Sequence, residues 1–140
     1  MTRAGGINLA EGYRDIWYTV DMEWLLARDP DVIVQHALSK FDLTKMAGGW
    51  SSLRAVKQGR IYRVFIGYCG VEPAGYIFQV RQMAALFHGD EVPWAGDIEA
   101  DGRAIFQQVY GRGDVFDQIA QEMDLTLERS TAAVSQPTER

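Results

Sequence analysis

The side chains able to do covalent chemistry are few and lie far apart in this chain. Cys69 is the single cysteine, and His36 and His88 are the two histidines. One cysteine excludes an internal disulfide, and this set lacks the clustered ligands of a zinc site. No basic residue stands near Cys69 to activate its thiol, so an inert thiol in a packed loop is the default interpretation. A G-x-S-x-G elbow and a sequence-level pairing of nucleophile and base are also missing. The sequence therefore predicts no enzymatic activity, no cofactor and no metal centre.

Residues suited to ligand contact are easier to find. His36 follows the predicted strand 31–34, and ligands of open α/β sheets sit outside the carboxyl ends of the strands. A half-buried, hydrogen-bonded histidine is the alternative. Arg63 lies within the next predicted strand and could reach an anionic ligand, on an unknown side of the sheet. Trp17 and Tyr18 either cover the edge of the core or line a cleft, where aromatic rings grip large ligands.

The elements that must position these residues read as alternating helices and strands. Asp21 is a good N-cap for a short helix, Trp24 to Leu26 supply its core face, and Pro30 ends it. The β-branched run 31–34 fits a strand covered on both faces. A short helix over 41–47 and another capped by Ser51 or Ser52 precede the second strand, 60–66. This connection is long enough for a parallel crossover.

The C-terminal part reads as helical. Pro73 suits the first turn of a helix over 74–88, whose apolar stripe we expect at Tyr76/Ile77, Val80, Met83/Ala84 and Phe87. Two amphipathic helices follow, over 98–110 and 115–123. The glycine spacing of the loop 67–73 does not match a nucleotide-binding loop. The sequence predicts one domain over 1–125 and a polar, flexible tail over 126–140.

Composition narrows the classes of partner. The net charge is −5, and the segment from Gly89 to Asp124 holds nine acidic and two basic residues. Such a balance argues against nucleic-acid binding, which needs a basic face. The chain shows neither a bilayer-spanning apolar run nor a signal peptide at its start. We expect a cytoplasmic protein or a piece of a longer, exported one.

Four segments, in the same order, closely resemble the C-terminal lobe of class III solute-binding proteins. These are the receptors of ABC importers for iron–siderophore complexes, haem and cobalamin. The segments are Gly5-Gly-Ile-Asn-Leu-Ala10, Val20-Asp-Met-Glu-Trp-Leu-Leu-Ala-Arg-Asp-Pro-Asp-Val-Ile-Val34, Trp50-x-x-Leu-x-Ala-Val-Lys-x-Gly-Arg-Ile-Tyr62, and Pro73 with Gln82-Met-Ala84 and Tyr110-Gly111. The resemblance covers roughly residues 4–124. It implies a three-layer α/β/α, Rossmann-like lobe with a small, mostly parallel sheet and a helical C-terminal part.

The resemblance also implies roles for single residues. Glu23 stands where the family places a carboxylate that docks on arginines of the membrane permease. Trp17 stands where corrinoid-binding relatives have a cleft aromatic. The loops around His36 and around Tyr68 and Cys69 correspond to cleft-facing loops. The implied ligand is a metal chelate, and the implied location of a full receptor is periplasmic, or extracytoplasmic and anchored to the membrane.

The family's first lobe and joining helix are missing from this chain. The exposed cleft face then requires that missing lobe or favours self-association. A free-standing, dimerising interaction domain derived from such a lobe, without a transport role, is therefore the alternative function.

Overall fold

The computed structural model describes residues 1–13, 19–39, 41–46, 48–65 and 72–128. Its helices and strands alternate as the sequence predicts, and the chain has a mixed α/β fold. The elements are α1 (Met22–Arg28), β1 (Ile33–His36), α2 (Arg54–Lys57), β2 (Ile61–Val64), α3 (Pro73–His88), α4 (Ile98–Tyr110) and α5 (Asp114–Glu122). Short 3-10 turns occur at Thr2–Ala4, Leu43–Lys45, Trp50–Ser52 and Gly89–Glu91.

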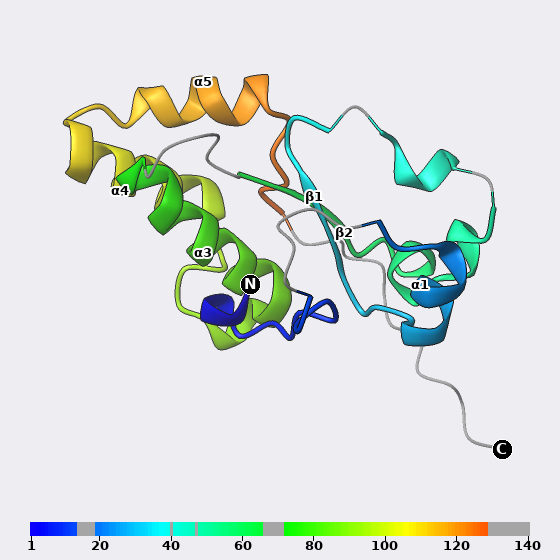
Figure 1. Ribbon diagram of the computed structural model, residues 1–140. Coiled ribbons are helices and arrows are strands. Elements are labelled where there is room, and N and C mark those ends of the chain that lie inside the picture. The colour runs from blue at the N-terminus through cyan, green and yellow to red at the C-terminus, as the bar shows by residue number, and fades with distance from the viewer. Residues whose placement is uncertain (14–18, 40, 47, 66–71, 129–140) are drawn as a thin grey trace, which may run out of the picture.

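The two strands form a parallel pair, with Ile33 opposite Ile61 and His36 opposite Val64. In Figure 1 the helices α3, α4 and α5 gather on one side of this pair and α1 lies on the other. Tyr62 and Val64 are buried and belong to the main core, so this face of β2 meets the large helical side. Successive side chains of a strand point to opposite faces, so Arg63 lies on the face turned away from that core.

The first strand is less covered than its sequence predicts. Every residue of β1 is half-exposed, so the expectation of a strand buried on both faces is wrong. The core-facing role expected for Trp24 to Leu26 is also wrong, because no residue of α1 is buried. Instead, Trp24 packs edge-on against Tyr13 and under the guanidinium of Arg28. The α1 side of the sheet is therefore a thin, partly solvated layer.

The caps of α1 follow the prediction. A carboxylate oxygen of Asp21 accepts a hydrogen bond from the Trp24 N–H at 2.7 Å. The helix ends at Arg28, and Asp29, which precedes Pro30, takes a left-handed backbone with φ of 38°. Proline disfavours the right-handed helical region for the residue before it, which explains the stop.

The crossover between the strands is less helical than expected. The helix predicted over 41–47 reduces to the 3-10 turn Leu43–Lys45 in the described residues. The serine cap predicted for α2 is wrong, because Asp29 supplies that hydrogen bond: its Oδ1 accepts from the Arg54 N–H at 2.7 Å. The Arg54 guanidinium in turn pairs with Asp31 at 2.8 Å. These bonds tie the end of α1 to the start of α2.

The long helix α3 begins at Pro73 and ends before Gly89, as predicted, and its predicted apolar stripe is correct in part, because Met83 and Ala84 are buried. Tyr76 and Ile77 are both 44% exposed, whereas Phe78, Gln82 and Ala85 are buried. Phe78 meets Phe116 of α5 edge-on, with ring centroids 4.7 Å apart. Both α4 and α5 lie within one residue of their predicted bounds and close the core over α3.

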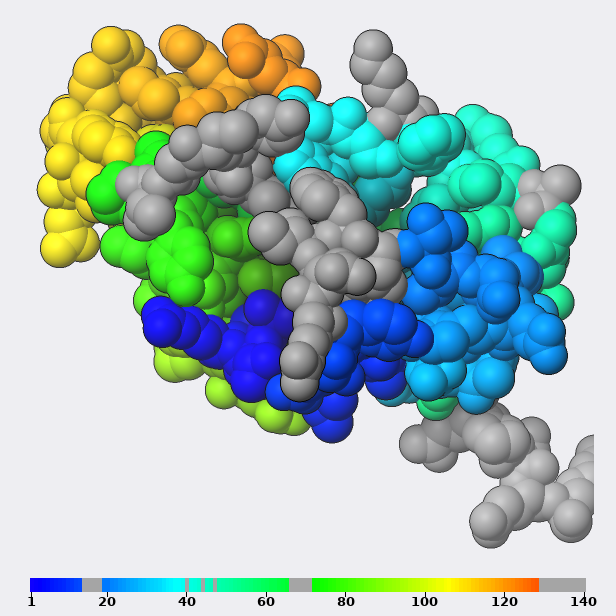
Figure 2. Space-filling model, viewed as in Figure 1, coloured from blue at the N-terminus to red at the C-terminus, as the bar shows by residue number. Residues whose placement is uncertain are grey.

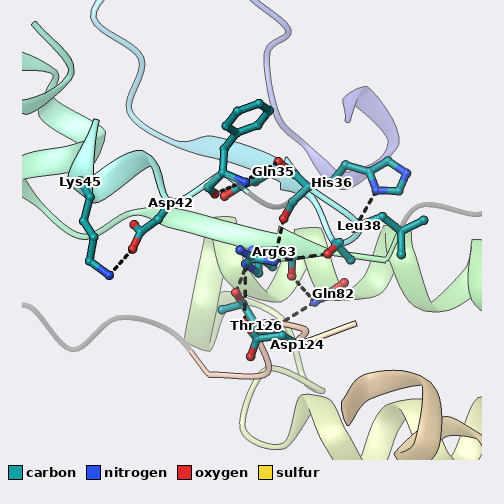
Figure 3. A network of polar contacts seen from close by, with 12 residues as sticks. Gln35, His36, Leu38, Asp42, Lys45, Arg63, Gln82, Asp124 and Thr126 are labelled. Carbon is teal, nitrogen blue, oxygen red and sulfur yellow. Dashed lines mark hydrogen bonds and ion pairs between the residues drawn. The ribbon is translucent and has the colours of Figure 1, made fainter. Parts of the chain in front are cut away.

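The outer edge of β2 is closed by groups from two other segments (Figure 3). Gln82, fully buried on α3, accepts from the Phe65 N–H and donates to the carbonyls of Arg63 and Thr126. Thr126 donates its N–H to the Arg63 carbonyl at 2.9 Å and accepts the Arg63 N–H on its hydroxyl at 2.8 Å. Thr126, the first residue of the expected tail, is thus bonded to the domain.

The N-terminal segment lies across the molecule between α3 and the α1 region (Figure 2). The imidazole Nε2 of His88 is 2.9 Å from the Ala4 carbonyl and holds the first turn against the end of α3. Gly5 has a φ of 79°, and a Cβ there would lie 2.4 Å from this ring. Glycine at this position therefore permits the close approach.

Candidate functional site

The carboxyl ends of β1 and β2 share one edge of the sheet, because the strands are parallel. His36 ends β1 there and is half-buried. Its Nδ1 accepts the Leu38 N–H at 3.0 Å, which assigns the ring proton of a neutral imidazole to Nε2. His36 is thus at the predicted edge, and its Nδ1 is engaged in shaping the loop that follows.

Arg63 lies one residue further from that edge and shapes the same loop from below (Figure 3). Its Nη1 donates to the Ala37 carbonyl at 3.3 Å and to the Ser39 carbonyl at 3.1 Å. Gln35, opposite Arg63 in the sheet, donates to the Ser39 hydroxyl at 2.9 Å. The structure therefore brings His36 and Arg63 to opposite sides of one loop rather than into a shared cavity.

Glu72 and Tyr110 form a contact at the start of α3 that the sequence analysis missed. Glu72 caps this helix, because its carboxylate accepts the N–H groups of Ala74 and Gly75. The Tyr110 hydroxyl, at the end of α4, donates to the same carboxylate. This hydrogen bond raises the pKa of Tyr110 above its ordinary value. The start of α3, otherwise a natural anion site, is occupied by the protein's own carboxylate.

Only a weak sequence signal pointed to that contact. Glutamate is not among the preferred N-cap residues, and Tyr110 is 38 residues away. Pro73 marks the helix start, which places Glu72 at the N-cap position.

Glu23 lies in the first turn of α1, on the surface. Its neighbours Asp21, Asp29 and Asp31 are engaged in a cap or with Arg54. Within the described parts of the chain, no hydrogen bond or ion pair engages the Glu23 carboxylate. Glu23 is therefore an accessible negative charge on a capped helix, as its predicted docking role requires.

The remaining predicted contacts, Trp17, Tyr18, Tyr68 and Cys69, lie outside the described residues. They stay predictions from the sequence. Among the described residues, no group of three or more His, Cys, Asp or Glu side chains is arranged to hold a metal ion. Over the same residues, no helix combines the length and apolar character needed to cross a bilayer.

Two hollows open on the described surface. One, of about 320 Å³, lies between the N-terminal segment and the start of β1, and Gly6, Val32 and Phe87 are among its walls. The other, of about 370 Å³, lies beside Arg63 on the face of β2 away from α3. Both are within the size range of small-molecule sites.

Comparison of the chain with protein-family models, with curated proteins and with solved structures gave no match. Functional assignment therefore rests on the residues, their geometry and the motif resemblance.

Proposed function

We propose that this chain is the C-terminal, ligand-binding lobe of an ABC-importer solute receptor for a metal chelate. The ligand would be a ferric siderophore, haem or a related complex, and the lobe itself catalyses no reaction. Four motifs in family order support the proposal, as does the observed sequence of α1, Pro30, β1, crossover, parallel β2 and α3. In this proposal the sheet belongs to a three-layer, Rossmann-like lobe.

The ligand would lie outside the carboxyl ends of the strands, against the loop that His36 and Arg63 shape. Trp17, Tyr18, Tyr68 and Cys69 complete the proposed contact surface. Aromatic and polar side chains suit a large chelate, which presents both apolar and hydrogen-bonding surface. The first lobe of such a receptor would supply the opposite wall of the cleft.

The observation that carries the proposal is the unengaged Glu23 carboxylate. Among the described residues, the neighbouring acids Asp21, Asp29 and Asp31 are held by a cap or by Arg54. The Glu23 carboxylate has no described partner and is open to an outside one. A capped helix fixes the position of the carboxylate, and arginines of a permease would bind it by charge-assisted hydrogen bonds. A receptor of this kind would work outside the cytoplasm, on the side where the permease presents its docking surface.

Uptake of a radiolabelled chelate by cells that make the full product of the gene tests this role. Truncation of one partner of a hydrogen-bonded charge pair costs about 2–5 kcal/mol in an interface, so we expect Glu23→Ala to slow uptake at least tenfold. Chelate affinity should stay unchanged, since Glu23 is not among the proposed ligand contacts.

Glu122→Ala is the matched control, because Glu122 is also exposed, at the end of α5, without a described partner. Equal uptake in both variants would contradict the docking role. The docking role would also be contradicted if Glu23→Ala bound the chelate more weakly and this weaker binding alone accounted for the slower uptake.

The second candidate function is a dimerising interaction domain derived from such a lobe. It is favoured by large apolar side chains on the described surface, such as Ile7 at 83% and Phe41 at 68% exposed. Light scattering after size exclusion separates the two functions. A stable dimer of the full gene product that binds no chelate would favour the interaction domain; a monomer that binds one would favour the receptor.

A further inference from the structure

The hollow beside Arg63 has the composition of a small polar site. It lies on the face of the sheet turned away from α3. The strands, the turn after β1 and the segment that follows α5 form its walls (Figure 3). Its polar side chains are those of Gln35, Asp42, Arg63, Asp124 and Thr126. Leu43 and Ile61 are among the apolar residues of its wall. We refer to it as the Arg63 pocket.

Arg63 is anchored on one side and available on the other. Its Nη1 is held by the carbonyls of Ala37 and Ser39, which fixes the plane of the guanidinium. Its Nε and Nη2 make no hydrogen bond within the described chain, although the side chain is 27% exposed. Two parallel N–H groups on one edge match the two oxygens of a carboxylate.

Asp124 faces that available edge without closing it. Its Oδ2 is 3.7 Å from the Arg63 Nε, which is an ion-pair distance but too long for a hydrogen bond. The Asp124 backbone is left-handed, with φ of 49°, and its side chain is 86% exposed. The other acid of the pocket, Asp42, is paired with Lys45 at 2.8 Å. Asp124 is therefore the loosely held anion of the pocket.

A cation edge beside a loosely held anion fits a ligand that carries an anionic and a cationic group on one carbon. The exposed Asp124 side chain turns outward to admit it, because its Oδ2 lies 3.7 Å from the Arg63 Nε. We propose that the Arg63 pocket binds a small α-amino acid. Its carboxylate takes the Nε–Nη2 edge of Arg63, its ammonium group takes Asp124, and its side chain lies toward Leu43 and Ile61. This inference goes beyond the proposed chelate transport, because the charged groups that it uses lie on the face of the sheet. Arg63 takes part in both, since it also holds the loop against which the chelate would lie.

The inference is tested with L-leucine and two analogues, each of which lacks one of its charged groups. These are the des-amino analogue 4-methylpentanoate and the des-carboxyl analogue 3-methylbutylamine. Binding to the full chain is followed by amide chemical shifts in two-dimensional NMR. We expect saturable shifts in the segments around Gln35, Arg63 and Thr126 with leucine. The des-amino acid should bind more weakly, by about two- to fivefold, because it loses an exposed charge pair. The amine should not bind detectably.

Two variants test which side chain binds the carboxylate of the ligand and which binds its ammonium group. Arg63→Gln should weaken leucine binding at least tenfold, since it removes the charged donors that the ligand carboxylate would take. Asp124→Asn should weaken leucine but strengthen 4-methylpentanoate, because it removes the attraction for ammonium and the repulsion of carboxylate. Asparagine tolerates a left-handed backbone, so this second variant keeps the fold even if loss of Arg63 disturbs the loop.

Asp90→Asn, an exposed change in the turn after α3, is the control and should alter neither affinity. The inference is overturned if leucine produces no saturable shift at tens of millimolar, or if the shifts lie elsewhere. It is also overturned if Asp124→Asn changes the two affinities in the same direction.

Discussion

Gln82 is the residue that most clearly connects sequence, fold and stability. A fully buried glutamine in a helix is uncommon, and this one bonds the N–H of Phe65 and the carbonyls of Arg63 and Thr126. It thereby closes the edge of β2, which would otherwise present unpaired backbone groups. The glutamine joins α3, the sheet and the C-terminal segment through a single side chain.

We predict that Gln82→Leu lowers the free energy of unfolding by about 2–4 kcal/mol. The variant leaves the buried Phe65 N–H and the Thr126 carbonyl without their partner, and each unsatisfied buried group costs about 1–3 kcal/mol. Urea denaturation followed by circular dichroism gives the difference. Gln108→Leu, on the exposed side of α4, should cost less than about 0.5 kcal/mol. Similar losses in both variants would contradict the edge-closing role of Gln82.

A second residue-scale prediction concerns Tyr110 at high pH. Its hydrogen bond to Glu72 raises the pKa of the phenol, so the protonated form is favoured by folding. This stabilisation is present below the ordinary tyrosine pKa of about 10 and is lost as pH rises through the higher pKa of the folded state. Tyr110→Phe should therefore flatten the loss of thermal stability above pH 10.

The difference in absorbance at 295 nm between wild type and Tyr110→Phe gives the titration of this phenol. It should have a midpoint above that of a model tyrosine peptide. A midpoint at or below the peptide value would show that the Glu72 contact does not form.

Residue-scale prediction from sequence succeeded where one residue acts on its own neighbours. Asp21 caps α1, Pro30 ends it and Pro73 opens α3, because each effect depends on the local backbone alone. Glu72 with Tyr110, and Asp29 with Arg54, join residues far apart in sequence. Such pairs are decided by tertiary packing, so no local rule reports them.

At the scale of elements, α4 and α5 meet through a close contact that only glycine permits. A Cβ on Gly102 would lie 2.4 Å from ring carbons of Phe116, which is buried in the core. Phe116 also packs against Phe78 and Phe106 and has little space to move. The two C-terminal helices are thus positioned around one aromatic ring.

We predict that Gly102→Ala destabilises the protein by about 1–3 kcal/mol, despite the better helix propensity of alanine. Gly96→Ala is the control, because nothing lies within 4 Å of a Cβ there and its φ is not positive. Thermal unfolding by calorimetry compares the two. An unchanged Gly102→Ala protein would contradict the α4–α5 packing described here.

Elements were predicted well in type and order, and less well in the face that each one buries. Of the stripe expected on α3, Met83 and Ala84 are buried, whereas Tyr76 and Ile77 are exposed. Phe78 and Gln82 are buried in their place. Apolar spacing alone could not decide, because α3 is apolar on several sides and one of its buried residues is polar. Likewise, the Val-Ile-Val run indicated a covered strand, whereas β1 remains half-exposed.

At the scale of the whole molecule, the described chain has one thick and one thin side. The helices α3, α4 and α5 bury the main core against one face of the sheet, and α1 with the crossover covers the other face only in part (Figure 1). Glu23 and the Arg63 pocket belong to the thin side. Substitutions at Glu23 and in the Arg63 pocket leave the main core intact, so these variants can be tested in the folded protein.

Titration with metal chelates is the most direct test of the receptor proposal. The protein is mixed in turn with a ferric siderophore, haem and cobalamin, and tryptophan fluorescence is followed, with free metal salt and metal-free siderophore as controls. The proposal predicts saturable quenching by one of these chelates, which falls in Trp17→Phe but persists in Trp50→Phe. No saturable quenching by any chelate, in the chain and in the full gene product alike, would contradict it.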